Sequence, residues 1–252
     1  MRPLGALRAP AYASVVGAPL DSLASVQRLA AGAMPFDMRP FVHIIPNQRG
    51  NSCVGHAIAQ CLRVRAAISG INIDPSALAI YAEARALEHR GAKILPDVGS
   101  YPEHAFAQLR TFGAVARSRW DDESSLEEPV PEDVYEAGFI AVVIGEYVIP
   151  TGRGAWDGIR KAHAARRPVF WARDVDTAYE DLGGELYRGI TEPVRGGHAG
   201  CLVFSDDVGS YDAGSWGRQH GANGFAHVSR EFIESEHVHT IKAFTATIAV
   251  VQ

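Results

Sequence analysis

The stretch that most constrains how this chain can fold is an amphipathic pattern that begins at Ser52 and ends at Gly70. Apolar residues recur in it at the i, i+3, i+4, i+7 and i+8 spacing of a buried helical stripe. We therefore predict a central helix with Ser52 as its N-cap and Gly70 as its stop. Cys53 then lies in the first turn, where backbone N–H groups and the helix dipole favour a thiolate. The apolar positions are Val54, Ala57, Ile58, Cys61, Leu62 and Ile68.

The remaining patterns change from helical to strand-like along the chain. Helical spacing predicts a short helix near the N-terminus and two helices after the central one, whereas alternating or continuous apolar runs predict strands after about residue 115. Helices followed by strands indicate an α+β protein in two lobes. The predicted helices cover residues 21–31, 75–89, 102–112 and 155–165, and the predicted strands cover residues 139–149, 169–171, 199–204 and 224–229.

The composition sets aside two classes of function. The chain has 252 residues, of which 24 are Lys or Arg and 29 are Asp or Glu, so its formal charge is 24 − 29 = −5. This acidic balance lacks the basic field that sequence-independent nucleic-acid binding requires. The chain also has no run of about 18 apolar residues that could span a bilayer. We therefore expect neither a nucleic-acid nor a membrane partner.

Residues 1–34 are expected to form an N-terminal arm. They are rich in Ala, Gly and Pro, and their apolar stretches are too broken for the hydrophobic region of a signal peptide. We therefore expect a cytoplasmic or virion-associated protein without a folded prodomain. We expect the arm to dock on a larger assembly, which would be a partner of this protein.

A cysteine at a helix N-terminus, followed far downstream by a histidine between small residues, has the layout of a thiol nucleophile with an imidazole partner. Here the cysteine is Cys53, and the histidine is His198 in the segment Gly-Gly-His-Ala. The imidazolium holds the thiolate ionised and protonates a leaving amine. Cys61 and Cys201 are predicted to be packing residues. No metal or other cofactor is expected.

Four segments, in the same order along the chain, resemble the motifs of the papain-like cysteine peptidases. This is the C1 family, and the resemblance is greatest to its compact bacterial and viral members. The segments are QRGNSCVGHA at residues 48–57, GSYP at 99–102, GGHA at 196–199, and GSWG at 214–217 with GANGF at 221–225. The resemblance implies an α+β, papain-like two-lobe fold. A helical lobe at residues 35–115 would hold the central cysteine-bearing helix, and an antiparallel β-rich lobe would follow at residues 116–252.

The resemblance also implies a role for each matching residue. Cys53 would be the nucleophile, His198 its general acid and base, and Gln48 the side-chain donor to the oxyanion, beside the N–H of Cys53. Gln48 lies one residue closer to the cysteine than is usual, and we favour it over Asn47 because a glycine-containing loop can absorb one residue. Trp216 would shield the histidine. The substrate-binding residues would be Gly99, Ser100, Tyr101, Gly197 and Trp216.

One departure from the family pattern affects the expected activity. Gly214 stands where the family has the asparagine that orients the histidine ring. The resemblance implies hydrolysis of peptide bonds through an acyl-enzyme, with a peptide or protein as substrate, and loss of an orienting residue usually lowers such a rate without abolishing it. One alternative is a catalytically weakened or inactive papain-like domain that serves as a structural or binding module in a virion or other assembly. Another is a cell-wall peptide amidase or an acyl transferase of related fold.

Overall fold

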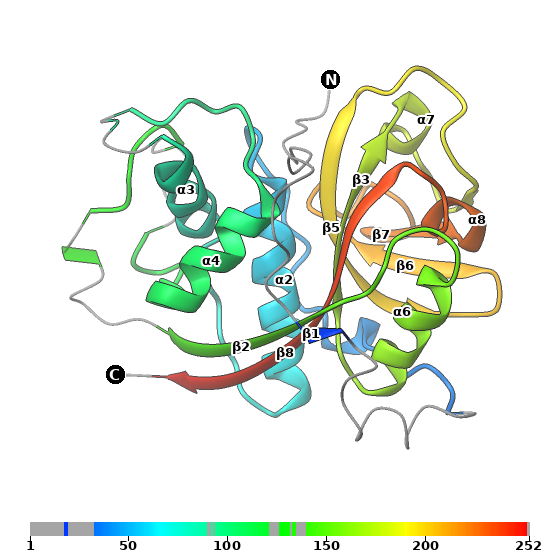
Figure 1. Cartoon of the computed structure of the whole chain (residues 1–252), viewed down its shortest axis with the longest axis horizontal. Helices are drawn as coiled ribbons and strands as arrows, with labels where there is room; N and C mark the ends of the chain where they lie inside the picture. Colours follow the sequence, from blue (N-terminus) through cyan, green and yellow to red (C-terminus); the bar gives the residue numbers. More distant parts are fainter. Residues whose placement is uncertain are drawn as a thin grey trace.

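The structure is a computed structural model, and it describes residues 18–19, 33–89, 92, 94–120, 126–131, 133–134 and 140–250. Helices fill the first half of these residues and antiparallel strands the second half (Figure 1), as the α+β prediction requires. The helix expected at residues 21–31 and most of the N-terminal arm lie outside the described residues. The division into lobes at residue 115 stays a prediction.

The helical half contains α2 (Cys53–Ile68), α3 (Ala77–Glu88) and α4 (Pro102–Phe112), after the short 3-10 helix η2 (Arg39–Phe41). The central helix α2 and its end before Gly70 confirm the sequence prediction. The predicted side-chain cap is wrong, because the Ser52 hydroxyl donates instead to the Arg49 carbonyl at 2.9 Å. The helix α3 begins two residues later than predicted, because Pro75 is still in an extended bridge with Ala116.

The second half is built on one eight-stranded sheet with the order β1-β2-β8-β3-β5-β6-β7-β4. Its neighbours are antiparallel except for the β1–β2 and β4–β7 pairs. The strands are β1 (Ala18–Pro19), β2 (Ile140–Val148), β3 (Val169–Val175), β4 (Leu186–Tyr187), β5 (Gly196–Ser205), β6 (Gly209–Ala213), β7 (Phe225–Ser229) and β8 (Val238–Val250). The helices among them are α6 (Ala155–Ala164), α7 (Thr177–Glu180) and α8 (Arg230–Ile233).

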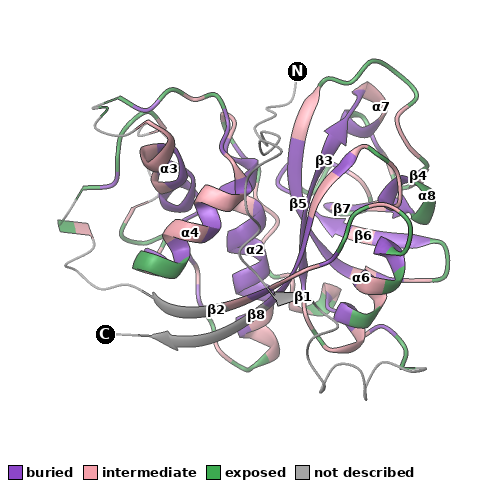
Figure 2. Cartoon of the chain, viewed as in Figure 1, coloured by how far each residue is buried: buried purple, intermediate pink, exposed green. Residues whose placement is uncertain are grey.

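The central strands β3 and β5 separate two hydrophobic cores, because successive side chains of a strand point to opposite faces. Phe170 on β3 and Cys201 on β5 pack in the core that contains the inner face of α2. Trp171 and Leu202, one position along each strand, pack instead in a second core with α6 and α8. In Figure 2 the ribbon along α2, β3 and β5 is mostly coloured as buried. The sheet therefore places α2 directly against the strand that carries His198.

Candidate active site

Cys53 is the first residue of α2, and its side chain is fully buried. Its backbone N–H is one of the four first-turn amides that a helix cannot satisfy internally. Such an amide can donate to an anion, so Cys53 offers a thiol and a donor from the same residue. Cys53 packs in the same core as Ala199, the residue next to His198.

His198 lies inside β5, which begins at Gly196 and so starts three residues earlier than the sequence predicted. In the β3–β5 register His198 is paired with Arg173, and Gly197 with Asp174. The His198 side chain is 1% exposed. Its ring stacks on Trp216, with ring centroids 4.0 Å apart and an interplanar angle of 23°. A rigid strand and an aromatic plane therefore both limit how the imidazole can turn.

Gln48 is held by the turn that also carries Trp216. Its backbone N–H donates to the Ser215 carbonyl at 2.7 Å, and the Ser215 hydroxyl donates to Gln48 Oε1. Gln48 Nε2 in turn donates to the Gly50 carbonyl at 3.1 Å. Because an amide carries two donor hydrogens on nitrogen, these contacts fix which end of the amide is the donor. Ser215 and Gln48 are 167 positions apart in the chain, so the sequence alone does not show that Ser215 fixes this amide.

The loop that contains Gly99, Ser100 and Tyr101 is fixed through Asp97. Asp97 Oδ1 accepts a hydrogen bond from the backbone N–H of Asn51 at 2.9 Å and another from the Tyr81 hydroxyl at 2.6 Å. The Gly99 amide donates to the same hydroxyl at 3.1 Å. The Asp97 carboxylate lies so close to Gly50, which has φ +57°, that a Cβ there would be 2.4 Å from Oδ2. Asp97 therefore joins the loop before Cys53 to the expected substrate loop.

Tyr81 and Asp97 were not among the residues that the sequence pointed to. Burial, and secondarily the bond to Asp97, raise the pKa of the Tyr81 phenol, so this hydroxyl stays protonated and can donate. Within the expected substrate loop, Ser100 is fully buried, and the Tyr101 amide donates to Glu88 Oε1 at 2.9 Å. The side chains that set the shape of this loop come from α3 and from the loop itself.

Gly214 lies directly after β6, and the space around it is open. A Cβ built on Gly214 would meet no atom within 4 Å, and its φ is outside the left-handed region. The third position of the expected triad is therefore free of steric conflict. The glycine is not required by the backbone conformation.

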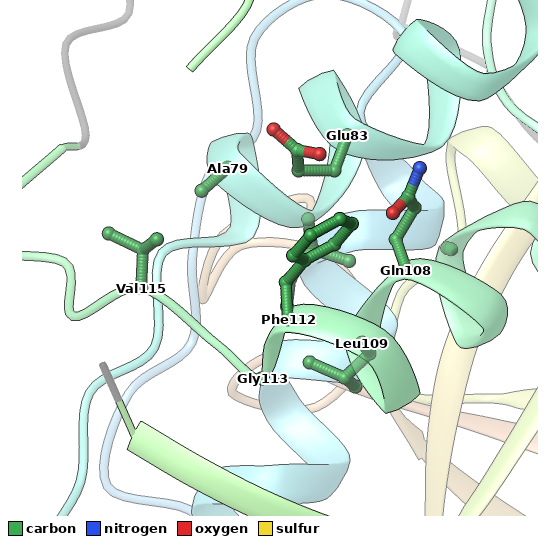
Figure 3. Close-up of a pocket in the computed structure, with 9 residues that line it drawn as sticks. Ala79, Glu83, Gln108, Leu109, Phe112, Gly113 and Val115 are labelled. Carbon is green, nitrogen blue, oxygen red and sulfur yellow. The ribbon is translucent and has the colours of Figure 1, made fainter. Parts of the chain in front are cut away.

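Two cavities near α2 and α3 differ in character. One of about 10 Å³ lies between α3 and α4, where the Phe112 side chain points toward α3 (Figure 3), and it has room for little more than one water molecule. The other, of about 240 Å³, is lined in part by Asn47, Arg49 and His56, close to the loop before Cys53. Burial, then the charges of Arg63 and Arg117, lower the pKa of His56 to about 3, so this imidazole is neutral.

Two other classes of site are absent from the described part of the chain. No group of three or more His, Cys, Asp or Glu side chains is arranged to hold a metal ion there. In the same residues no helix combines the length and the apolar character needed to cross a bilayer.

No family model and no curated protein matches the sequence, but solved structures match the fold. Xylellain, a cysteine protease from Xylella fastidiosa, matches with a TM-score of 0.71 at 19% identity over 100% of this chain and 98% of its own. A procathepsin B from Trypanosoma congolense matches with a TM-score of 0.69 at 16% identity over 99% and 87%. The bromelain protease from Ananas comosus matches with a TM-score of 0.60 at 15% identity over 85% and 98%. The chain therefore has the papain-like α+β fold that these cysteine proteases share.

Proposed function

We propose that this protein hydrolyses peptide bonds through a thioester acyl-enzyme on Cys53. The observation that carries the proposal is that adjacent residues of one turn hold the two expected partners of the thiol. Ser215 bonds the Gln48 amide, and Trp216 stacks on the His198 ring. A turn that fixes both an amide donor and an imidazole suits acyl transfer. This reaction needs a hydrogen-bond donor to the oxyanion and a group that carries protons.

In this proposal the Cys53 thiolate attacks the peptide carbonyl carbon, and the carbonyl electrons move to oxygen. The Cys53 N–H and the Gln48 Nε2 group would stabilise that oxyanion. As the carbon–nitrogen bond breaks, the imidazolium of His198 protonates the leaving amine, and a thioester forms. Neutral His198 then takes a proton from water, whose oxygen attacks the thioester. The acid product leaves and the thiolate–imidazolium pair returns.

The fully buried thiol adds one requirement to this mechanism. Cys53 is 0% exposed and His198 only 1%. A peptide can therefore reach the sulfur only after the residues around it move. Opening of the site, rather than bond chemistry, is then a step that can limit the rate.

The test is hydrolysis of a fluorogenic peptide library in reducing buffer, with peptide-level mass spectrometry after brief iodoacetamide treatment. We expect turnover by the wild type, none by Cys53→Ala, and alkylation of Cys53 well before the other cysteines. Cys61→Ala is the matched control, because Cys61 is also a fully buried α2 residue and its sulfur lies 3.3 Å from that of Cys201. Equal alkylation of all three thiols would contradict the nucleophile assignment.

A binding or structural module is the second candidate function, and the bare position at Gly214 together with the buried thiol favours it. It predicts no turnover from the wild type on any peptide, with Cys53 reduced and the protein folded. A cell-wall amidase or acyl transferase would instead form the acyl-enzyme with cell-wall peptides or pass it to an amine. Adding cell-wall peptides and an acceptor amine to the same assay separates these activities from hydrolysis of ordinary peptides.

A further inference from the structure

A fully buried ion pair lies on the same face of the sheet as His198. Arg173 Nη2 donates to Asp212 Oδ2 at 2.7 Å, and both side chains are 0% exposed. The Tyr179 hydroxyl donates to the same oxygen at 2.9 Å. Arg173 is also the residue paired with His198 in the β3–β5 register, and directly paired residues have Cβ atoms about 4.5–5.5 Å apart. Arg173 therefore lies directly beside His198 on the neighbouring strand, and its guanidinium reaches Asp212.

The Asp212 carboxylate lies over β5, one strand repeat from His198. A Cβ built on Gly200 would be 2.1 Å from Asp212 Oδ1 and 2.4 Å from Oδ2, so only glycine leaves room for the carboxylate there. Gly200 and His198 face the same side of the sheet, because they are two residues apart on one strand. Asp212 Oδ1 is buried and makes no hydrogen bond to any described residue. It can therefore accept a bond.

The aromatic residues around His198 connect it to the same group of charges. Trp216, which stacks on His198, packs edge-on against Tyr179 with ring centroids 5.7 Å apart. His220 lies 4.9 Å from the Trp216 ring and its Nε2 lies 2.7 Å from the Tyr179 carbonyl. Tyr179, whose hydroxyl bonds Asp212, thus supports both the carboxylate and the tryptophan.

Stability alone does not account for this ion pair. Burying two charges costs several kcal/mol per ion. Apolar residues of similar volume can often replace such a pair without loss of folding stability. Arg173 alone, buried opposite His198, would oppose a positive imidazolium. A carboxylate beside it offsets that charge and can orient the ring, which is the task left open at Gly214.

We propose that Asp212, held by Arg173 and Tyr179, is the positioning residue that orients His198 and favours its imidazolium in place of the side chain missing at Gly214. This inference rests on the proposed function of Cys53 and His198. On the elements around His198, the titratable and charged groups that belong to this network or stand next to it in the strand register are Cys53 of α2, Arg173 and Asp174 of β3, Tyr179 of α7, Asp212 of β6 and His220 of the loop after β6.

The test measures the rate at which iodoacetamide alkylates Cys53 in the full-length protein between pH 4 and pH 10, read by mass spectrometry. It needs no substrate. In the wild type we expect thiolate formation well below the ordinary thiol pKa of about 8.5, and a return toward that value in His198→Ala. In Asp212→Asn we expect the apparent pKa to rise by about one unit or more, so that alkylation at any pH below the wild-type apparent pKa falls about tenfold or more.

Two further variants separate positioning from folding. Arg173→Met/Asp212→Asn leaves no unpaired charge, and we expect an intermediate pKa that is still above the wild-type value. If Asp212→Asn does not fold, this double variant carries the test. Glu146→Gln is the matched control, because Glu146 is buried and pairs with Lys242 at 3.1 Å, yet belongs to β2. It should lose stability without a change in the alkylation profile.

An unchanged profile in folded Asp212→Asn or in the double variant would overturn the inference, as would an equal shift in Glu146→Gln. Identical profiles for the wild type and His198→Ala would mean that no thiolate–imidazolium pair exists. That result would overturn the proposed function and this inference together. The two failures are therefore distinguishable.

Discussion

At the scale of single residues, His163 is a buried imidazole outside the proposed site. It is 0% exposed, its Nδ1 lies 2.8 Å from the Ser205 hydroxyl, and its Nε2 lies 3.1 Å from the Leu202 carbonyl. Burial lowers its pKa to about 4, against the opposing effect of the Leu202 carbonyl. His163 is therefore neutral in the folded protein at pH 5, whereas the unfolded chain, with a pKa of about 6.5, binds the proton.

This difference predicts a loss of stability in acid. Between about pH 6.5 and pH 4 the unfolded state holds the extra proton, so the free energy of unfolding falls by up to about 1.4 kcal/mol per pH unit as the pH drops. His163→Gln should flatten this slope without abolishing it, because His56, with a pKa of about 3, acts in the same direction. Urea unfolding at pH 7 and pH 5 measures the slope.

How far the site could be predicted from the sequence depends on the separation of the contacts. Cys53 and His198 stand in local patterns that indicate their chemistry, a helix start and a glycine-flanked histidine. Asp97 and Asp212 stand in no such pattern, and the GSWG segment that contains Ser215 does not show its bond to Gln48. The partners of Ser215, Asp97 and Asp212 lie 167, 46 and 39 residues away in the chain. No local spacing shows which distant side chain completes a hydrogen bond in a folded protein.

At the scale of elements, β6 and the turn after it determine what stands beside the histidine. The open space at Gly214 predicts that Gly214→Asn folds normally. An asparagine there adds a second orienting group, so we expect kcat on a fluorogenic peptide to rise by roughly fivefold, equivalent to about 1 kcal/mol in the barrier. The gain should be larger in an Asp212→Asn background. An equal or smaller gain in that background would argue against a shared role.

The matched control for this change is Gly184→Asn. Gly184 also has no atom within 4 Å of an added Cβ and no left-handed φ, but it lies in the loop before β4. It should leave kcat and KM unaltered. A rise in kcat from both substitutions would point to a general effect of removing a glycine rather than to a fixed imidazole.

Elements with one strong period could be predicted from the sequence, whereas four strands could not: the two-residue strands β1 and β4, and the longer strands β6 and β8. The helix α2 has an unbroken apolar stripe, and its predicted bounds hold. The strands β6 and β8 were missed. Asp212 stands in β6 and Lys242 in β8, and both are buried. A strand with a buried charge does not show the apolar alternation by which strands are recognised, because its partner is supplied by another element.

At the scale of the whole molecule, α2 couples the two halves. Its buried face packs in one core with residues of β3, β5 and β8, so the helical half cannot lose α2 without exposing the sheet. We therefore expect one cooperative unfolding transition. Ile58→Ala, in the buried face of α2, should lower the free energy of unfolding by about 2–5 kcal/mol.

Tryptophan fluorescence in a Trp120→Phe background tests this coupling. Trp120 packs against the core of the helical half, whereas the other tryptophans, Trp156, Trp171 and Trp216, pack in the second core, which has no α2 residue. The urea midpoint of fluorescence should fall with Ile58→Ala as far as the midpoint of far-UV circular dichroism. A lower circular-dichroism midpoint with an unmoved fluorescence midpoint would show that the halves unfold separately. Arg65→Ala, an exchange in the last turn of the same helix, is the control.

In the turn at residues 214–217, Ser215 hydrogen-bonds the Gln48 side chain, and the next residue, Trp216, stacks on the His198 ring. A displacement of this turn, by heat or by a distant substitution, therefore disturbs the Gln48 amide and the orientation of the imidazole ring together, while the His198 backbone stays in β5. A substitution that loosens the turn should for this reason weaken both groups at once rather than one of them alone.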